Sequence, residues 1–123
     1  MTTMTTERIT ITMSERRPLS IAKDDWPVIA RAYWHNGEHE CQANTVRKIL
    51  VRQHADGRRI VYGLQGAGQG GQYIGTRNPE GGFLLSAGSS EEETVRAIRR
   101  VGGIIDDPEL ADACIADLPA ESI

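Results

Sequence analysis

Residues 35–41 (HNGEHEC) bring two histidines and a cysteine close together in the sequence. Imidazole nitrogens and thiolates are good zinc ligands. The spacing argues against a shared site, because Asn36-Gly37 disfavours a helix and in a hairpin His35 and His39 would project to opposite faces. We therefore expect no metal and no cofactor here, but one histidine in a turn and one in a sheet.

Acid–base and nucleophilic chemistry find little support in the same segment. Cys41 with a nearby histidine could form a nucleophilic pair. In an antiparallel hairpin, however, Cys41 falls on the apolar face, where a thiol is usually inert. Glu38 and Glu40 fall on a turn and on an outward face, so no two carboxylates face each other across a cleft. We expect no catalytic residue, and a small enzyme is the third alternative.

A glycine-rich run at 66–71 (GAGQGG) satisfies the G-x-G-x-x-G pattern of dinucleotide-binding loops. Such a site also needs a helix whose N-terminus faces the pyrophosphate. The residues that follow do not form one, since Asn78-Pro79 comes soon after. The run is expected to connect two strands, and phosphate binding is the less favoured alternative.

A second hairpin carries the strongest functional feature, a basic ladder. Asp56-Gly57 is a two-residue turn signal, and the implied pairs are 53 with 60, 51 with 62 and 49 with 64. The buried face then holds Ile49, Val51, Ile60, Tyr62 and Leu64, and the outward face holds Lys48, Leu50, Arg52, His54, Arg59 and Val61. Lys48, Arg52 and Arg59 could bind nucleic-acid phosphates, an acidic protein surface or the glutamates of the chain's own helix.

Two C-terminal helices would carry an acidic surface. Ser90 and Glu93 form a capping box for the first helix, which Gly102-Gly103 should end. Asp107-Pro108 caps the second helix. The apolar stripes are Val95, Ile98 and Val101 on the first helix, and Leu110, Cys114 and Leu118 on the second. Four acidic residues off those stripes could bind a basic partner groove by mimicking phosphates: Glu91, Glu92, Asp112 and Asp117.

The remaining segments read as strands. Residues 8–13 alternate polar and apolar side chains, and 18–21 is a short second candidate. Residues 26–34 could form a helix capped by Asp24 or Asp25, but we favour a hairpin over 26–44 that turns at Asn36-Gly37, with Val28, Ala30, Ala32 and Trp34 on one face. Residues 72–76 and 82–86 read as strands joined by a turn at 78–81. Strands first and helices last predict an α+β fold, an antiparallel meander with two C-terminal helices on one face.

Length and composition suit one domain. The chain has 123 residues, 14 Lys and Arg against 17 Asp and Glu, and a net charge of −3. We expect 14–123 to be a single domain and 1–13 to be a flexible N-terminal arm or an edge strand. Two cysteines without CxxC spacing, and no export signal, predict a cytoplasmic protein. No apolar run approaches 18 residues, so we expect no membrane span.

Charge is uneven along the chain. Residues 46–90 carry a net charge of +4 and residues 91–123 carry −6. The two regions can attract each other or serve two partners. An overall acidic balance argues against a dedicated nucleic-acid-binding protein.

Three runs carry a resemblance: residues 20–30 (SIAKDDWPVIA), 40–44 (ECQAN) and 51–58 (VRQHADGR). From Ser14 to the end, the chain resembles small uncharacterised accessory proteins of bacterial plasmids and integrative mobile elements. The resemblance implies no activity and no site residue. It implies a context, in which such proteins are often inhibitors of host defence, of the anti-CRISPR or anti-restriction type, or regulators of transfer.

The sequence therefore predicts a non-enzymatic interaction protein, with an anti-defence inhibitor as its most specific form. A protein partner is expected, such as a host nucleic-acid-handling complex. The alternative is a nucleic-acid-binding accessory protein that uses the basic ladder. An exposed edge strand near 8–13 or 72–76 could also support a homodimer.

Overall fold

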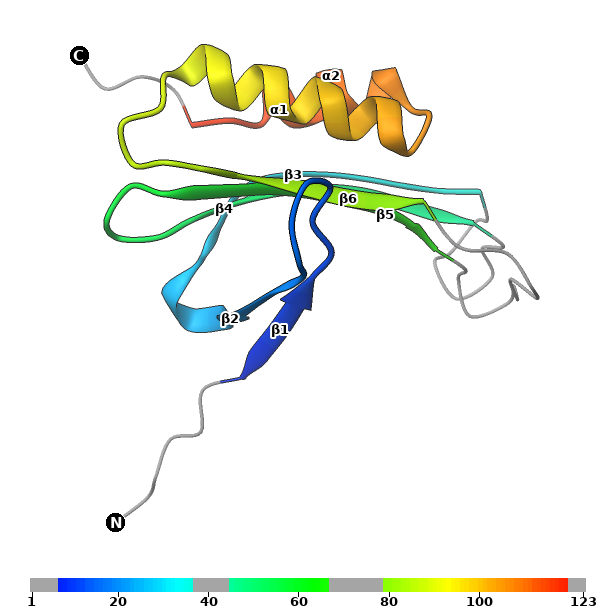
Figure 1. Ribbon diagram of the computed structural model, residues 1–123. Coiled ribbons are helices and arrows are strands. Elements are labelled where there is room, and N and C mark those ends of the chain that lie inside the picture. Colours follow the sequence, from blue (N-terminus) through cyan, green and yellow to red (C-terminus); the bar gives the residue numbers. More distant parts are fainter. Residues whose placement is uncertain (1–6, 37–44, 67–78, 120–123) are drawn as a thin grey trace.

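The computed structural model describes residues 7–36, 45–66 and 79–119 (Figure 1). Its strands and helices follow one another as β1 (Arg8–Ile11), β2 (Leu19–Ala22), a 3₁₀ turn (Lys23–Asp25), β3 (Val28–His35), β4 (Val46–Gln53), β5 (Arg59–Gly66), β6 (Glu80–Leu85), α1 (Glu91–Ile104) and α2 (Pro108–Ala116).

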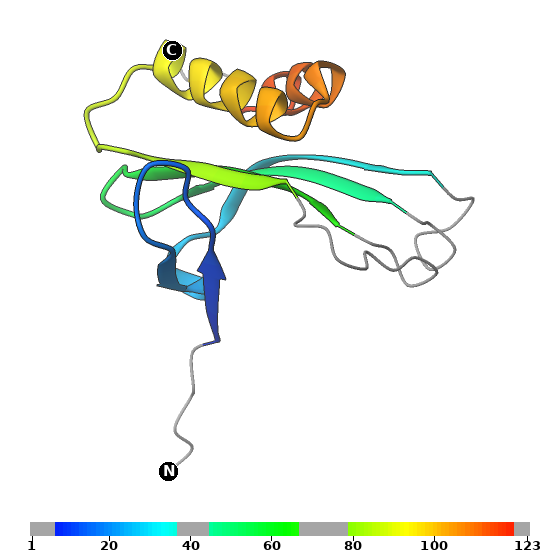
Figure 2. The same ribbon diagram turned by 45° about the vertical axis from the view of Figure 1, so that its right-hand side comes forward.

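Three layers make up the described part of the molecule. Strands β3, β4, β5 and β6 form an antiparallel meander in sequence order. Both helices cover one face of this sheet, and the small β1–β2 sheet lies under the other face (Figures 1 and 2). The predicted α+β class, with a meander and two C-terminal helices on one face, is confirmed.

The larger core fills the space between the sheet and the helices. Ile49, Val51 and Val61 of the sheet are fully buried beneath Ile98 and Val101 of α1. Burying each such side chain contributes roughly 1.5–3 kcal/mol. The helix lies close to the sheet because β5 has no side chain at Gly63, where a Cβ would collide with Val101.

A smaller core holds the N-terminal segment against the opposite face. Ile11, Met13, Ile21 and Trp26 are buried there against Ile60 of β5. Strand β1 pairs with β2, in the register of Ile9 opposite Ile21, and not with the four-stranded sheet. From here on we call residues 8–22 the arm, a different range from the 1–13 named above, because they reach from below the sheet to its β6 edge.

The register of the β4–β5 hairpin differs by one residue from the prediction. The predicted two-residue turn is wrong, because the loop contains three residues, Ala55-Asp56-Gly57. His54 N–H donates to the Arg58 oxygen at 2.9 Å, and Gly57, at φ +96°, donates to the His54 oxygen at 2.9 Å. This is a type I turn followed by a left-handed glycine, the usual three-residue hairpin loop. Val51 therefore faces Val61 and Arg52 faces Ile60, which reverses the predicted faces of β5.

Strand β3 pairs with β4, whereas the prediction paired it with residues that return from Asn36-Gly37. Tyr33 faces Lys48, and Asn36 closes the connection by two bonds to Thr45, at 3.3 and 3.0 Å. The predicted return strand lies in 37–44, outside the described residues. The predicted alternation on β3 holds for buried Ala30 and Ala32, but Trp34 is 38% exposed.

Both predicted helix caps are confirmed, but one predicted helix end is wrong. The Ser90 side chain accepts the Glu93 N–H, and that of Asp107 accepts the Leu110 N–H. The prediction that Gly102-Gly103 ends α1 is wrong, since the helix runs to Ile104. A Cβ at Gly102 would lie 2.7 Å from the Ala111 Cβ, so this glycine permits close packing of the helices.

Strand β6 begins earlier than expected. The predicted turn at 78–81 overlaps it, because β6 already pairs with β5 from Glu80, which faces Leu64. The predicted strand at 72–76 lies outside the described residues.

The hairpin loop yields the first testable prediction. Gly57→Val should lower the free energy of unfolding by at least about 1 kcal/mol, because a β-branched residue resists positive φ. Gly88→Val is the matched control, since a Cβ there meets nothing within 4 Å, and it should stay within about 0.5 kcal/mol of the parent. Urea unfolding measures both variants, and equal losses would contradict the loop geometry.

Candidate functional site

The predicted basic ladder is split between the two faces of the sheet. Lys48 and Arg52 lie on the face toward the arm, whereas Arg59 lies on the helix face, because the true register moves every β5 side chain to the opposite side. The prediction of one continuous basic surface is therefore wrong.

Arg52 is an internal residue. Only 8% of it is exposed. Its Nε donates to the Tyr62 hydroxyl at 2.9 Å, and its Nη1 donates to the Trp26 carbonyl at 2.9 Å. The guanidinium thus joins β4, β5 and the segment that leads into β3, and it is not presented to a partner.

Arg59 bonds to α1 of the same chain. Its Nη1 donates to Glu91 Oε2 at 3.0 Å and to Thr94 Oγ1 at 3.1 Å, and its Nε donates to Gln53 at 2.8 Å. Of the three roles considered for the ladder, contact with the chain's own helix glutamates is the one observed for Arg59.

Three of the four predicted acidic residues also make internal contacts. Glu91 binds Arg59, and Asp112 binds Arg99 at 2.8 Å. Asp117 Oδ2 accepts the outward-facing backbone N–H of Arg31 at 2.9 Å, so it covers part of the β3 edge. Glu92 has no ion-pair partner within the ranges that the structure describes. Two of the four predicted carboxylates are therefore paired with arginines of the chain itself.

Lys48 is the member of the ladder that stays at the surface. It lies opposite Tyr33, and both line a hollow of about 360 Å³ with Arg31, Ala32 and Leu50. Use of this surface by nucleic acid stays a prediction.

The one cysteine within the described residues, Cys114, is not an activated nucleophile. Burial raises the pKa of the Cys114 thiol to about 12, with the nearby Asp117 charge adding to the effect. Such a thiol is protonated near neutral pH and is a poor nucleophile. Glu38, His39, Glu40 and Cys41 lie outside the described residues, as does the glycine run after Gly66. In the ranges that are described, no three His, Cys, Asp or Glu side chains are placed to hold a metal ion.

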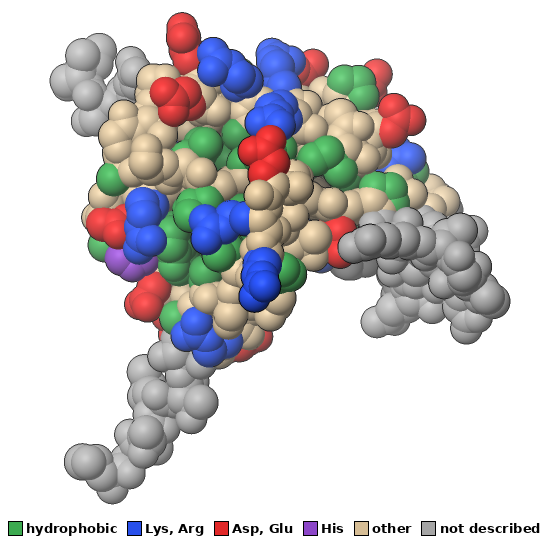
Figure 3. Space-filling model, viewed as in Figure 1, with side chains coloured by type: hydrophobic (Ala, Val, Ile, Leu, Met, Phe, Trp, Pro, Cys, Tyr) green, Lys and Arg blue, Asp and Glu red, His purple; other side chains and the backbone are tan. Residues whose placement is uncertain are grey.

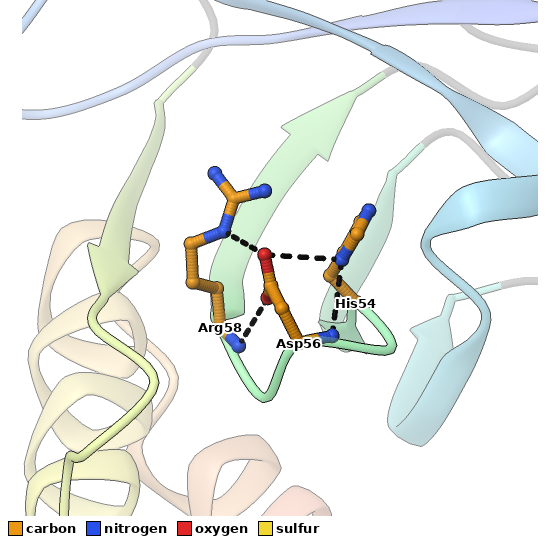
Figure 4. Close-up of polar contacts among 3 residues, drawn as sticks. All are labelled: His54, Asp56 and Arg58. Atoms are coloured by element: carbon orange, nitrogen blue, oxygen red, sulfur yellow. Dashed lines mark hydrogen bonds and ion pairs between the residues drawn. The ribbon is translucent and has the colours of Figure 1, made fainter.

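A polar cluster closes the β4–β5 loop (Figure 4). Asp56 accepts the Arg58 backbone N–H at 2.9 Å, which lowers the pKa of its carboxyl, and also contacts Arg58 Nε at 2.7 Å. His54 Nδ1 accepts the Asp56 N–H at 3.1 Å, and its ring lies 5.0 Å from that of Trp26. These bonds are local and fix the turn.

Strand β6 provides an edge to the four-stranded sheet. Gly82 directs its N–H and C=O away from β5, where Ser14 of the arm binds both: Ser14 Oγ accepts the N–H at 3.2 Å, and Ser14 N–H donates to the carbonyl at 2.9 Å. Polar groups alternate along an antiparallel strand, so Leu84 directs its N–H and C=O the same way. Among the described residues, no group bonds to them.

A groove of about 430 Å³ runs along this edge between α1 and the arm. Its floor is Gly82–Leu85, one wall contains Glu93, Arg96, Ala97 and Arg100 of α1, and the other contains Met13, Glu15 and Arg16 of the arm. Figure 3 shows this side of the molecule, with basic side chains around an apolar hollow below the helices.

The walls of the groove meet at one ion pair. Arg100 of α1 binds Glu15 of the arm at 2.8 Å, and its guanidinium lies 4.1 Å above the Phe83 ring. Phe83 is 9% exposed beneath this cover. A cation above an aromatic ring is attracted to its π-face. This contact therefore holds a charged side chain of the rim directly over the apolar floor.

None of the residues that line this groove was predicted to have a functional role. Arg96 and Arg100 lie one turn apart on α1, whereas Arg16 is about 80 residues away, and only the packing of arm and α1 on opposite faces brings it near them. The available signal was local: Phe83-Leu84-Leu85 is an apolar run at the predicted last strand of the meander, where an edge is expected.

Comparison with known proteins finds no family model, no curated protein and no solved structure that matches the chain. Neither of the two helices described is long and apolar enough to cross a membrane.

The buried position of Arg52 yields a second prediction. Arg52→Met should lower the free energy of unfolding by about 2 kcal/mol, because it leaves the buried Trp26 carbonyl without its donor. Lys48→Met on the same strand and face should change it by less than about 0.5 kcal/mol. Urea unfolding compares the two. A small and equal loss of unfolding free energy in both variants would indicate that Arg52 lies at the surface, as the predicted basic ladder requires.

Proposed function

We propose that this chain is a non-enzymatic interaction protein whose β6 groove binds an extended segment of a protein partner. One observation carries the proposal. Leu84 presents a backbone N–H and C=O to the groove, and no described residue pairs with them. An extended peptide that adds to a sheet edge satisfies such groups through main-chain bonds.

The surroundings of Leu84 suit a peptide strand. The floor supplies apolar contact at Phe83 and Leu85, and the walls supply charged side chains at the rim. This arrangement, with an apolar centre and a polar rim, is typical of interaction sites. Ser14 covers the neighbouring position Gly82, so the arm limits where an added strand can begin.

The resemblance to accessory proteins of mobile elements supplies a setting for such a partner. An inhibitor of host defence acts by occupying a surface of its target, and a strand held in the groove would serve that purpose. The anti-defence role and a host nucleic-acid-handling partner remain proposals that rest on this resemblance.

Strand addition can be tested with a blocked hexapeptide of alternating valine and glutamate, titrated into the ¹⁵N-labelled full chain and followed by NMR. We expect the largest amide shift changes at Leu84 and its neighbours in β6. Methylating the peptide nitrogens at one alternate set of positions should weaken binding about fivefold or more, because the lost bond to the Leu84 carbonyl contributes roughly 1 kcal/mol.

Methylation of the other alternate set is the matched control, because those nitrogens face away from the sheet edge. It should leave the affinity within about twofold of the parent peptide. Equal effects of the two sets, or no shift in β6, would contradict strand addition. Stronger binding of an oligothymidylate, with shifts around Lys48, would instead support the nucleic-acid alternative.

A further inference from the structure

We propose that the partner strand is acidic, and that Glu15 of the arm is an internal competitor for the arginines that receive its carboxylates. The inference rests on the proposed function, since it names the chemistry of the segment that the β6 groove binds.

Two free cations stand in the groove. Arg16 of the arm and Arg96 of α1 both line it, and neither has an ion-pair partner within 7–36, 45–66 and 79–119. By contrast, ion pairs with carboxylates occupy five other arginines: Arg47, Arg58, Arg59, Arg99 and Arg100. The groove therefore holds guanidinium groups that the chain itself leaves without a carboxylate.

The Glu15–Arg100 pair shows where a carboxylate is accepted. It joins the arm to α1 across the β6 edge, with its atoms 2.8 Å apart and the two side chains 67% and 54% exposed. Exposed ion pairs of this kind contribute little to stability. A ligand carboxylate can therefore replace Glu15 on Arg100 at small cost, while the guanidinium keeps its place above Phe83.

The geometry of an added strand matches these charges. Successive side chains of a strand point to opposite faces of the sheet. A strand beside Leu84 would therefore direct one alternate set of side chains toward α1, where Arg96 and Arg100 lie, and the other set toward the arm and Arg16. In a peptide that alternates valine with glutamate, the glutamates all point to one of these two walls. Two acidic residues, Glu15 and Glu93, and three arginines line the groove. Once a ligand carboxylate displaces Glu15 from Arg100, only Glu93 of these lining residues still offers a carboxylate of the chain to the three arginines.

The test compares three blocked hexapeptides, in which valine alternates with glutamate, glutamine or lysine, by calorimetry against the full chain. We expect the glutamate peptide to bind at least about fivefold more tightly than the glutamine peptide, and the lysine peptide most weakly. The advantage of glutamate over glutamine should shrink as sodium chloride is raised, because these charges are exposed.

Variants of the chain identify which charged side chains bind the carboxylates of the peptide. Arg16→Gln with Arg96→Gln should remove most of the glutamate peptide's advantage, whereas Arg99→Gln, on α1 but outside the groove, should preserve it. Glu15→Gln keeps the side chain's size and should tighten glutamate-peptide binding about threefold or more, with less effect on the glutamine peptide. Glu92→Gln is its matched control and should leave both affinities within about twofold. Thermal unfolding confirms that each variant is folded.

The outcomes separate this inference from the proposed function. If the glutamine peptide binds as tightly as the glutamate peptide and shifts Leu84, strand addition stands and the acidic partner is wrong. If Glu15→Gln changes nothing while glutamate is still preferred, Glu15 is not a competitor. If no peptide binds, the proposed function itself fails.

Discussion

The guanidinium of Arg52, buried beneath the sheet, holds together the parts on which the groove depends. Its bonds to the Trp26 carbonyl and the Tyr62 hydroxyl fix the segment before β3 against β5. Trp26 in turn packs with Ile11 and Met13 of the arm. The arm is thereby held under the sheet, so that Ser14 reaches Gly82 and Glu15 reaches Arg100. A buried cation with good hydrogen bonds thus positions a wall of the groove, although it touches no ligand.

The groove arises because two layers cover opposite faces of one edge strand. Helix α1 packs above β6 and the arm packs below it, and neither covers the Leu84 edge. Small residues allow this close approach: a Cβ at Gly82 would lie 2.8 Å from the Tyr62 Cβ and 3.2 Å from the Thr12 oxygen. Uncovered edges usually invite pairing with another chain. Here the edge is short and has charged walls, which restricts what can bind.

The sequence predicted the fold class and both helix caps, because these depend on local patterns such as Ser90 and Asp107-Pro108. It failed where one residue of loop length decides the outcome. A third residue in the β4–β5 loop moves Arg59 to the helix face and turns Val61 inward. Gly102 was mistaken for a helix end because its cause, Ala111, lies on another helix. The groove could not be predicted, since Arg16 of the arm meets Arg96 and Arg100 of α1 only through packing of distant segments.

The openness of the β6 edge is the central claim, and amide hydrogen exchange of the free protein measures it most directly. The Leu84 amide should exchange far faster than that of Phe83, which points toward β5, and faster than that of Gly82, which Ser14 binds. We expect rapid exchange at Leu84 and protection at both Gly82 and Phe83. Protection of Leu84 equal to that of Phe83 would mean that the edge is already occupied, and would contradict an open β6 edge.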